Sequence, residues 1–159
     1  MIKDYIVTQM NIESIKKHGA LDLVWQVFLE FEAPDYSEEG IQEFKKFIDL
    51  NSIEQKINKN EILFWGCFSG ESIVGVAATR QPCHISLLFV DKEHHRQGIG
   101  RELLSTITSF FKEEGVNREM TVNSSPYAVE IYHKLGFIDT DTEQLVNGIR
   151  FTPMKYIFS

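Results

Sequence analysis

The feature that most constrains the fold of this chain is the segment 84–111, where the spacing of the apolar residues changes from that of a strand to that of a helix. Residues 84–90 read HISLLFV, a short apolar run that predicts a buried strand. A charged loop follows, then Gly98 and Gly100, and from Leu103 to Phe111 the apolar residues recur on one helical face. This order predicts an α/β fold in which a strand leads through a glycine-containing turn into an amphipathic helix.

The start of that helix has the composition of an anion-binding cradle. Glycines let the backbone approach a ligand, and the free N–H groups of a first helical turn point toward it along the helix dipole. His94, His95, Arg96 and Arg101 add positive or protonatable groups around the turn. The glycines are equally compatible with a plain tight turn, so the residues alone leave both interpretations open.

Two other phosphate-binding motifs are excluded by the residues that follow the glycines. A phosphate-loop NTPase requires Lys and then Ser or Thr after the last glycine, and Arg101 and Glu102 stand there instead. A dinucleotide-binding fold requires a third Gly or Ala where this chain has Leu103.

The remaining sequence predicts one mixed sheet with helices between its strands. Its 159 residues fit a single domain, 1–159. The apolar patterns predict strands at 4–9, 62–68, 73–79 and 119–123, strand-like segments in the tail, and helices over 21–31, from Ser37 to Ile48 and over 126–134. We therefore expect a sheet that combines hairpins with helical crossovers.

Composition excludes several classes of protein. A net charge of −7 argues against a nucleic-acid-binding protein, which needs a basic face. No apolar run approaches the roughly 20 residues of a membrane helix, and no secretory signal opens the chain, so we expect a cytoplasmic protein. Cys67 and Cys83 are expected to be buried, reduced thiols. No metal site is expected, because His94 and His95 lack a recognisable ligand spacing.

Two segments resemble the signature motifs of the GNAT superfamily of N-acetyltransferases. Residues 95–100, HRQGIG, resemble the family's Gln/Arg-x-x-Gly-x-Gly/Ala motif, with His95 at the Gln/Arg position. Residues 123–137, NSSPYAVEIYHKLGF, resemble the pattern Asn-x-x-Ala-x-x-x-Tyr-x-x-x-Gly-Phe, with Ser125 in place of the Asn. The resemblance extends over residues 62–158. It implies a GNAT-like mixed, largely antiparallel central sheet flanked by helices on both faces.

The resemblance also implies a reaction and a set of site residues. The chain would transfer an acetyl group from acetyl-CoA, its co-substrate, directly to a primary amine. A backbone N–H near Leu88 would stabilise the oxyanion, and Tyr132 would be the general acid. The implied cofactor-binding residues are Leu88, Phe89, Val90, His95, Arg96, Gln97, Gly98, Ile99, Gly100, Arg101, Tyr132 and either Asn123 or Ser125.

The acceptor and the general base are left open at this stage. A primary amine is almost fully protonated at neutral pH, so a base is needed: Glu30, Glu32, His84 or water alone. Five acidic residues between positions 30 and 39 form either a solvated loop or a site that attracts a cationic acceptor, which could be a small molecule or a lysine side chain. A homodimer is possible, and the alternative function is a non-catalytic acyl-CoA-binding sensor or regulatory module.

Overall fold

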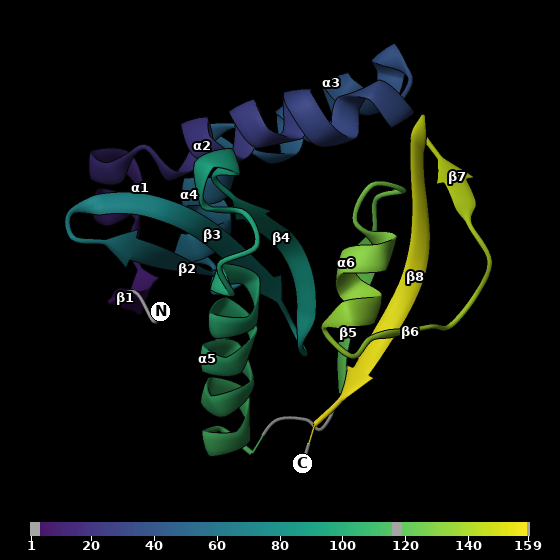
Figure 1. Ribbon diagram of the computed structural model, residues 1–159. Coiled ribbons are helices and arrows are strands. Elements are labelled where there is room, and N and C mark those ends of the chain that lie inside the picture. Colours follow the sequence, from purple (N-terminus) through teal and green to yellow (C-terminus); the bar gives the residue numbers. More distant parts are fainter. Residues whose placement is uncertain (1–3, 116–118, 159) are drawn as a thin grey trace.

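The computed structural model describes residues 4–115 and 119–158, which form one eight-stranded sheet with helices on both faces (Figure 1). The strands are β1 (Tyr5–Met10), β2 (Ile62–Ser69), β3 (Ser72–Arg80), β4 (His84–Val90), β5 (Glu119–Ser124), β6 (Ile138–Asp139), β7 (Gln144–Val146) and β8 (Ile149–Ile157). The helices are α1 (Ile12–His18), α2 (Ala20–Val27), α3 (Glu38–Phe47), α4 (Leu50–Asn58), α5 (Ile99–Glu113) and α6 (Val129–Lys134).

The strand order is β1-β2-β3-β4-β5-β8-β6, with β7 also pairing with β8. All of these pairs are antiparallel except β4 with β5, which run parallel. The expected mixed, largely antiparallel sheet is therefore confirmed. The parallel pair requires a crossover, and the amphipathic helix α5 provides it.

Each face of the sheet has its own hydrophobic core. Helix α5 buries Leu103, Ile107 and Phe111 against one face, together with Trp65 and Met120. Helices α1 to α4 cover the other face with a second cluster, which includes the buried residues Ile15, Val24, Phe28 and Ile53. Because α5 and the N-terminal helices pack on opposite faces, as Figure 1 shows, the prediction of helices on both faces is confirmed.

Two helices were not predicted. Helix α1 has a capping box in which the Asn11 and Ser14 side chains each accept the other's backbone N–H, and α4 has Asp49 as its N-cap, whose carboxylate accepts the Ser52 N–H. Both helices are short, and single buried residues, Ile15 and Ile53, attach them to the sheet. An apolar face this narrow gives little periodicity to detect.

The predicted helix over residues 21–31 changes its winding partway. Helix α2 ends at Val27, a π-helical turn follows at Phe28–Glu32, and a 3-10 turn at Ala33–Asp35 contains Pro34. A π-helical turn contains more residues than an α-helical turn, so every later side chain is rotated about the helix axis relative to regular α-helical winding. The π-helical turn therefore determines where Glu30, Phe31 and Glu32 point, and helical periodicity does not predict it.

The cysteines behave as expected. Cys67 and Cys83 are both free and fully buried, and burial raises the pKa of their thiols to about 11 and about 12. Both thiols therefore stay protonated at neutral pH. Among the described helices, none has the length and apolar character needed to cross a membrane.

Candidate active site

A widening gap between β4 and β5 forms the centre of the site. The two strands pair only at His84 with Thr121 and at Ile85 with Val122, and beyond that point they separate, as Figure 1 shows. Ser86 is the extra residue of a β-bulge, since Ala78 of β3 faces Leu87 while Thr79 faces Ile85. The bulge reverses the alternation of side chains: Ile85 belongs to the core on the α5 side, whereas Leu87 belongs to the core under the N-terminal helices.

The edge of β4 that faces the gap carries backbone groups without a strand partner. The Asp91 N–H, just after β4, donates to the Val74 carbonyl of β3 at 2.9 Å. Because N–H groups alternate between the two edges of a strand, those of Leu88 and Val90 point to the opposite edge, toward the gap. The Val90 carbonyl on this edge accepts a hydrogen bond from His95 Nε2 at 2.8 Å.

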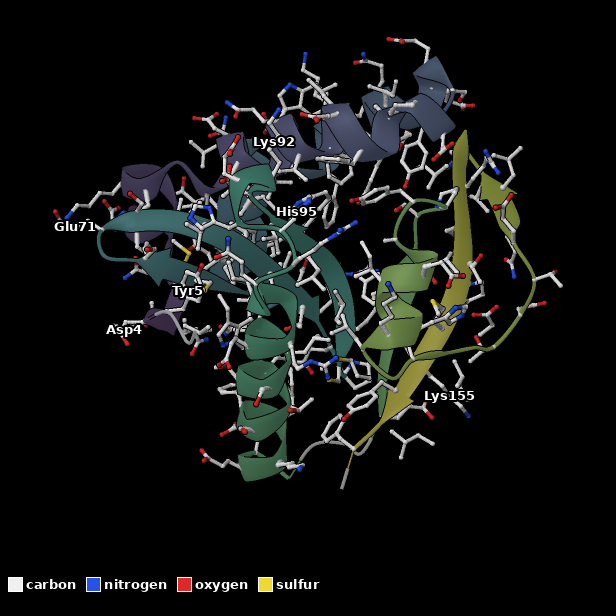
Figure 2. The ribbon with its side chains drawn as sticks, viewed as in Figure 1. Asp4, Tyr5, Glu71, Lys92, His95 and Lys155 are labelled. Carbon is white, nitrogen blue, oxygen red and sulfur yellow. The ribbon has the colours of Figure 1, made fainter. Side chains whose placement is uncertain are left out.

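The loop from β4 to α5 is shaped by two residues with positive φ. Arg96 has a φ of 65° and Gly98, the N-cap of α5, has a φ of 80°. Lys92 and His95, both labelled in Figure 2, lie on this loop. The Gln97 side chain turns away to accept a hydrogen bond from the Tyr5 hydroxyl of β1, so of the predicted cofactor-binding residues on the loop it alone does not line the cavity described next.

The two glycines of the motif differ in what the structure requires of them. Gly98 adopts a left-handed conformation that favours glycine. Gly100 lies in the first turn of α5 without a positive φ, and a Cβ placed there would meet no described atom within 4 Å. Since alanine is the better helix former, nothing within the described chain accounts for glycine at position 100. Open space in front of a helix N-terminus favours the cradle interpretation over the plain turn.

A first cavity of about 590 Å³ lies in front of this helix N-terminus. Its walls come from the end of β4, the loop, the first turn of α5, helix α6 and the π-helical turn. Among the predicted site residues it brings together Leu88, Phe89, Val90, His95, Arg96, Gly98, Ile99, Gly100, Arg101 and Tyr132. Arg101 also donates to the Lys134 carbonyl at 3.2 Å, which ties α5 to the end of α6 across the gap.

A second cavity of about 310 Å³ lies on the other side of the gap, under helix α3. It is lined by Tyr36, Glu43, Phe44, Phe47, Ser86, Asn123, Ser125 and Ile149, together with the residues it shares with the first cavity. The shared residues are Glu32, Leu88, Phe89, Ala128 and Tyr132. The two cavities therefore meet where a carboxylate, a phenol and an unpaired strand edge come together.

Glu32 is the acidic group at this junction. Its side chain is half-buried, and burial raises the pKa of its carboxyl from 4.5 to about 7, although a hydrogen bond from the Ser125 hydroxyl partly opposes the shift. A carboxylate with a pKa near neutrality holds or releases a proton with little free-energy cost at physiological pH. Glu32 is thus suited to proton transfer.

Tyr132 faces Glu32 from helix α6. Its ring is buried and packs edge-on against Phe137 at 5.2 Å, and among the described residues its hydroxyl has no hydrogen-bond partner. Burial, the Glu32 carboxylate and the Tyr36 hydroxyl raise the pKa of Tyr132 well above 10. The phenol therefore stays protonated and is free to donate a hydrogen bond into the junction.

The two candidates for the family's Asn position lie differently. Ser125 is buried, its hydroxyl accepts the Ala128 N–H at 3.3 Å, and it also contacts Glu32. Asn123 is exposed at the rim of the second cavity, opposite Pro153 in the β5–β8 pair. Ser125 therefore holds the first turn before α6 and orients Glu32, while Asn123 is placed toward the second cavity.

The other base candidates lie outside both cavities. Glu30 is exposed and forms an ion pair with Lys92 at 3.3 Å. His84 hydrogen-bonds Thr121 at 2.8 Å, and burial next to Arg80 lowers its pKa to about 4. In an unbroken strand, His84 and Leu88 would point to the same face of the sheet. The bulge at Ser86 places them on opposite faces. Of the three side chains proposed as bases, the structure brings only Glu32 to the junction.

The acidic residues 30–39 do not form one cluster. Glu30 pairs with Lys92, Asp35 lies 3.9 Å from Arg150, and Glu38 accepts from Gln42, while Glu32 alone enters the cavities. Within the described residues, no group of three or more His, Cys, Asp or Glu side chains could hold a metal ion.

Ile149, one of the residues that line the second cavity, follows a close contact between two glycines. The turn between β7 and β8 places the Gly148 carbonyl over the N-terminus of α3, where the Ser37 N–H and hydroxyl both point to it at 3.4 Å. A Cβ on Gly40 would overlap the Gly148 carbonyl oxygen and would lie 2.7 Å from its carbonyl carbon. Because Ile149 lines the cavity, this contact fixes one of its walls.

Replacing Gly40 with Ala should destabilise the protein and disturb the second cavity. Overpacking against a backbone carbonyl costs about 1–3 kcal/mol, which corresponds to a fall in Tm of roughly 3–10 °C. Thermal unfolding measures the fall in Tm. For the reaction that the family resemblance implies, steady-state kinetics should show a higher KM for the acceptor, while titration calorimetry should show an unchanged affinity for coenzyme A. A variant as stable as the wild type would show that the Gly40–Gly148 contact is not tight in solution.

The residues of the second cavity on α3 were not identified as site residues from the sequence. Phe44 and Phe47 were expected only as the apolar face of a helix, and Tyr36 and Glu43 carried no motif. The acidic run before α3 was the one signal in this region, and it pointed to Glu32 among several equivalent carboxylates. The lining of the second cavity is assembled by the position of α3 across the gap, which is a tertiary feature.

Comparison with known proteins identifies the family. The model of the acetyltransferase (GNAT) domain matches residues 32–158. N-acetyltransferase 8 from Homo sapiens is 32% identical over 106 residues, which cover 58% of this chain and 46% of that protein. N-acetyltransferase 8B from Rattus norvegicus is 30% identical over 112 residues, covering 60% of this chain and 50% of that protein. The chain thus spans about half the length of these curated relatives.

Solved structures show the same fold. The PaiA N-acetyltransferase from Thermoplasma acidophilum, in complex with coenzyme A, superimposes with a TM-score of 0.80 at 19% identity, covering 98% of this chain and 99% of that one. A GCN5-related N-acetyltransferase from Rhodopseudomonas palustris gives a TM-score of 0.81 at 20% identity, covering 99% and 98%. With a family model that matches most of its length and a fold shared with these enzymes, the chain belongs to the GNAT acetyltransferase family.

Proposed function

We propose that this protein transfers an acetyl group from acetyl-CoA to a primary amine, with the two substrates bound on opposite sides of the gap between β4 and β5. The single observation that carries the proposal is the junction: two cavities meet at Glu32, Leu88 and Tyr132. The name of the human relative, an N-acetyltransferase, and the coenzyme A bound to the Thermoplasma protein support the same reaction.

The first cavity binds acetyl-CoA. The backbone N–H groups of residues 95–101 bind the pyrophosphate, and the open space at Gly100 leaves room for its close approach. Arg96 and Arg101 add positive charge at the same place. The unpaired edge of β4 from Leu88 to Val90 binds the amide groups of the pantetheine arm as an added strand would.

The acetyl transfer takes place at the junction. Glu32 accepts a proton from the ammonium group of the acceptor, and the freed amine attacks the thioester carbonyl. The N–H of Leu88 stabilises the negative charge that develops on the carbonyl oxygen. As the C–S bond breaks, the attacking nitrogen loses its second proton to the departing sulfur, which leaves as the thiol of coenzyme A, and Tyr132 donates a hydrogen bond to that sulfur. Placement of Glu32 and Tyr132 at the meeting point favours an enzyme over a non-catalytic acyl-CoA sensor, because binding alone requires neither group.

Thermal unfolding with acetyl-CoA, free coenzyme A and NAD tests the first half of the proposal. A ligand at 100 times its Kd stabilises the native state by about 2.7 kcal/mol, which raises Tm by several degrees. We expect this shift with acetyl-CoA and coenzyme A but not with NAD. Release of free thiol in the presence of amines tests the second half, and stabilisation without thiol release would favour the sensor instead.

Replacing Gly100 with Ala should stabilise the protein and weaken its binding of acetyl-CoA. The methyl group meets open space in the free protein, and alanine is favoured over glycine in a helix by about 0.5–1 kcal/mol, so Tm should rise by roughly 2–3 °C. The same methyl group would occupy the approach path of the pyrophosphate. We expect at least a ten-fold increase in Kd, measured by calorimetry.

Gly70 provides the matched control for this substitution. It lies in the β2–β3 turn with a φ of 61°, far from the motif in sequence, and a Cβ there also meets open space. Gly70→Ala should lower Tm, because the left-handed conformation disfavours alanine, and should leave the Kd for acetyl-CoA unchanged. An unchanged Kd in Gly100→Ala would mean that no ligand approaches position 100.

A further inference from the structure

The second cavity has a wall built from stacked aromatic rings. Phe44 lies on Phe28 with ring centroids 4.0 Å apart, and it also meets Phe89 at 5.9 Å. Phe47 and Tyr36 extend the aromatic lining along α3 and the segment before it. Because Phe28 is fully buried, the ring of Phe44 is held in place from behind. Such a wall favours an acceptor with a flat, apolar body.

The charged side chains that line the same cavity are all acidic. Its lining includes the carboxylates of Glu32 and Glu43, and no lysine, arginine or histidine is found among the described residues that line it. Arg150 follows Ile149, but its guanidinium is held by Glu143 at 3.1 and 3.3 Å and lies 3.9 Å from Asp35. Lys56 lies over the Phe47 ring, with its Nζ 4.3 Å from the ring centroid, but does not line the cavity. An acceptor that carries its own carboxylate would therefore be desolvated next to like charges, without a cationic partner among the lining residues.

The volume of the cavity indicates the size of the acceptor. Its inner end is the junction at Glu32, where the ammonium group must lie for acetyl transfer, and Glu43, Phe47 and Ile149 line the part away from the junction. A volume of about 310 Å³ lies at the lower end of the range for ligand pockets. This space suits a small molecule whose ring lies one short linker away from its amine.

We infer that the acceptor is a small arylalkylamine without a carboxylate, bound with its ammonium group at Glu32 and its ring against Phe44, Phe47 and Phe89. This inference rests on the acetyl transfer proposed above. Glu43 at the rim acts as a specificity-determining residue that disfavours acceptors with a negative charge.

A diamine is less well suited to the same cavity. Glu43 lies 3.9 Å from Lys46, so a second ammonium group that reached toward this carboxylate would also approach a like charge. The bare methylene chain of a diamine would also make less contact with the aromatic wall than a ring does.

The test compares three acceptors at saturating acetyl-CoA by thiol release: phenethylamine, phenylalanine and 1,4-diaminobutane. Phenylalanine differs from phenethylamine by the carboxylate alone, and the diamine lacks the ring. We expect kcat/KM for phenethylamine to exceed that for phenylalanine about 100-fold and that for the diamine about ten-fold. If either of the other two is the better acceptor, the inference is wrong while the proposed acetyl transfer stands.

A charge-removing variant tests the role of Glu43. Glu43→Gln should raise kcat/KM for phenylalanine relative to phenethylamine about five-fold, because one of the two repelling carboxylates is gone. Glu39→Gln is the matched control, since Glu39 is exposed on the same helix and does not line the cavity. An equal ratio in both variants would overturn the role assigned to Glu43.

Direct binding separates failure of this inference from failure of the proposed function. Phenethylamine is titrated by calorimetry into protein saturated with coenzyme A. Binding without turnover of any acceptor would support the assigned cavity and contradict the acetyl transfer. Absence of both binding and turnover of phenethylamine would overturn the inference.

Discussion

Replacing Glu32 with Gln should lower kcat/KM for the amine about 10²–10⁴-fold, the range typical for loss of a general base. The glutamine keeps the shape of the side chain and its contact with Ser125 but cannot accept a proton from the ammonium group. The Kd for acetyl-CoA should be unchanged, because its binding depends on the loop and helix on the other side of the gap.

The pH profile of the same variant is a sharper test than its rate. In the wild type, kcat/KM should rise with pH through about 7, where Glu32 loses its proton, and should level off until the amine itself titrates near 10. In Glu32→Gln the rise near pH 7 should disappear, and activity should continue to increase toward pH 10 as the neutral amine becomes available. A rise near pH 7 that survives in the variant would assign it to another group.

Glu30→Gln provides the matched control for this prediction. Glu30 lies in the same π-helical turn, is exposed, and pairs with Lys92 outside both cavities. We expect its pH profile to match that of the wild type. Equal losses in Glu30→Gln and Glu32→Gln would indicate that the turn, not the carboxylate at the junction, is responsible.

Stability should change in the opposite direction from activity in Glu32→Gln. The folded-state pKa of about 7 lies above the unfolded value of 4.5, so between these values the native state holds a proton that the unfolded state has released. Stability of the wild type therefore falls as pH rises from about 4.5 to about 7. The variant lacks this loss, so its Tm should exceed that of the wild type above pH 7 and approach it near pH 4.5.

Replacing Tyr132 with Phe should lower kcat about 100-fold with little change in Tm or in the Kd for coenzyme A. The ring keeps its packing on Phe137, and only the hydroxyl that faces the junction is lost. Removal of one hydrogen-bond donor from an acyl-transfer site typically costs about 10²–10³ in kcat. We expect Tyr132 to donate a hydrogen bond to the departing sulfur without transferring its proton, because the pKa of Tyr132 is raised well above that of a thiol.

Tyr156→Phe is the matched control for Tyr132→Phe. Tyr156 also packs on Phe137, with centroids 5.4 Å apart, but it lines neither cavity. We expect wild-type kcat in this variant. A loss of less than three-fold in Tyr132→Phe, with folding intact, would remove Tyr132 from the chemistry and leave it a packing residue.

The sequence was most informative where function depends on the backbone. The loop and helix start at 91–101 could be placed because glycine spacing and apolar periodicity are local properties, and the structure assembles most of the predicted cofactor-binding residues around one cavity. Asn123 and Ser125 line only the second cavity, and on the loop the side chain of Gln97 is the exception, because it hydrogen-bonds Tyr5, which is 92 positions distant in sequence. No local pattern contains that contact.

The general base illustrates the limit of sequence-based prediction. Glu30, Glu32 and His84 were equivalent candidates in the sequence, and three tertiary features separate them. The π-helical turn directs Glu32 inward, and an ion pair with Lys92 holds Glu30 at the surface. The bulge at Ser86 places His84 on the opposite face of β4 from Leu88. Each depends on packing between distant segments.

The sequence by itself determined the succession of strand, glycine-containing loop and amphipathic helix at 84–111, because hydrophobic periodicity and turn residues act over short distances along the chain. Two local motifs in it also indicated the family to which the chain belongs. The tertiary structure alone decided which carboxylate meets Tyr132 and which side chains enclose the second cavity. Those features arise where α3 and the first residue of β8, Ile149, lie against the gap between β4 and β5, and burial raises the pKa of Glu32 to about 7. Desolvation of a charged group depends on every segment that surrounds it, so it becomes defined only when the chain has folded.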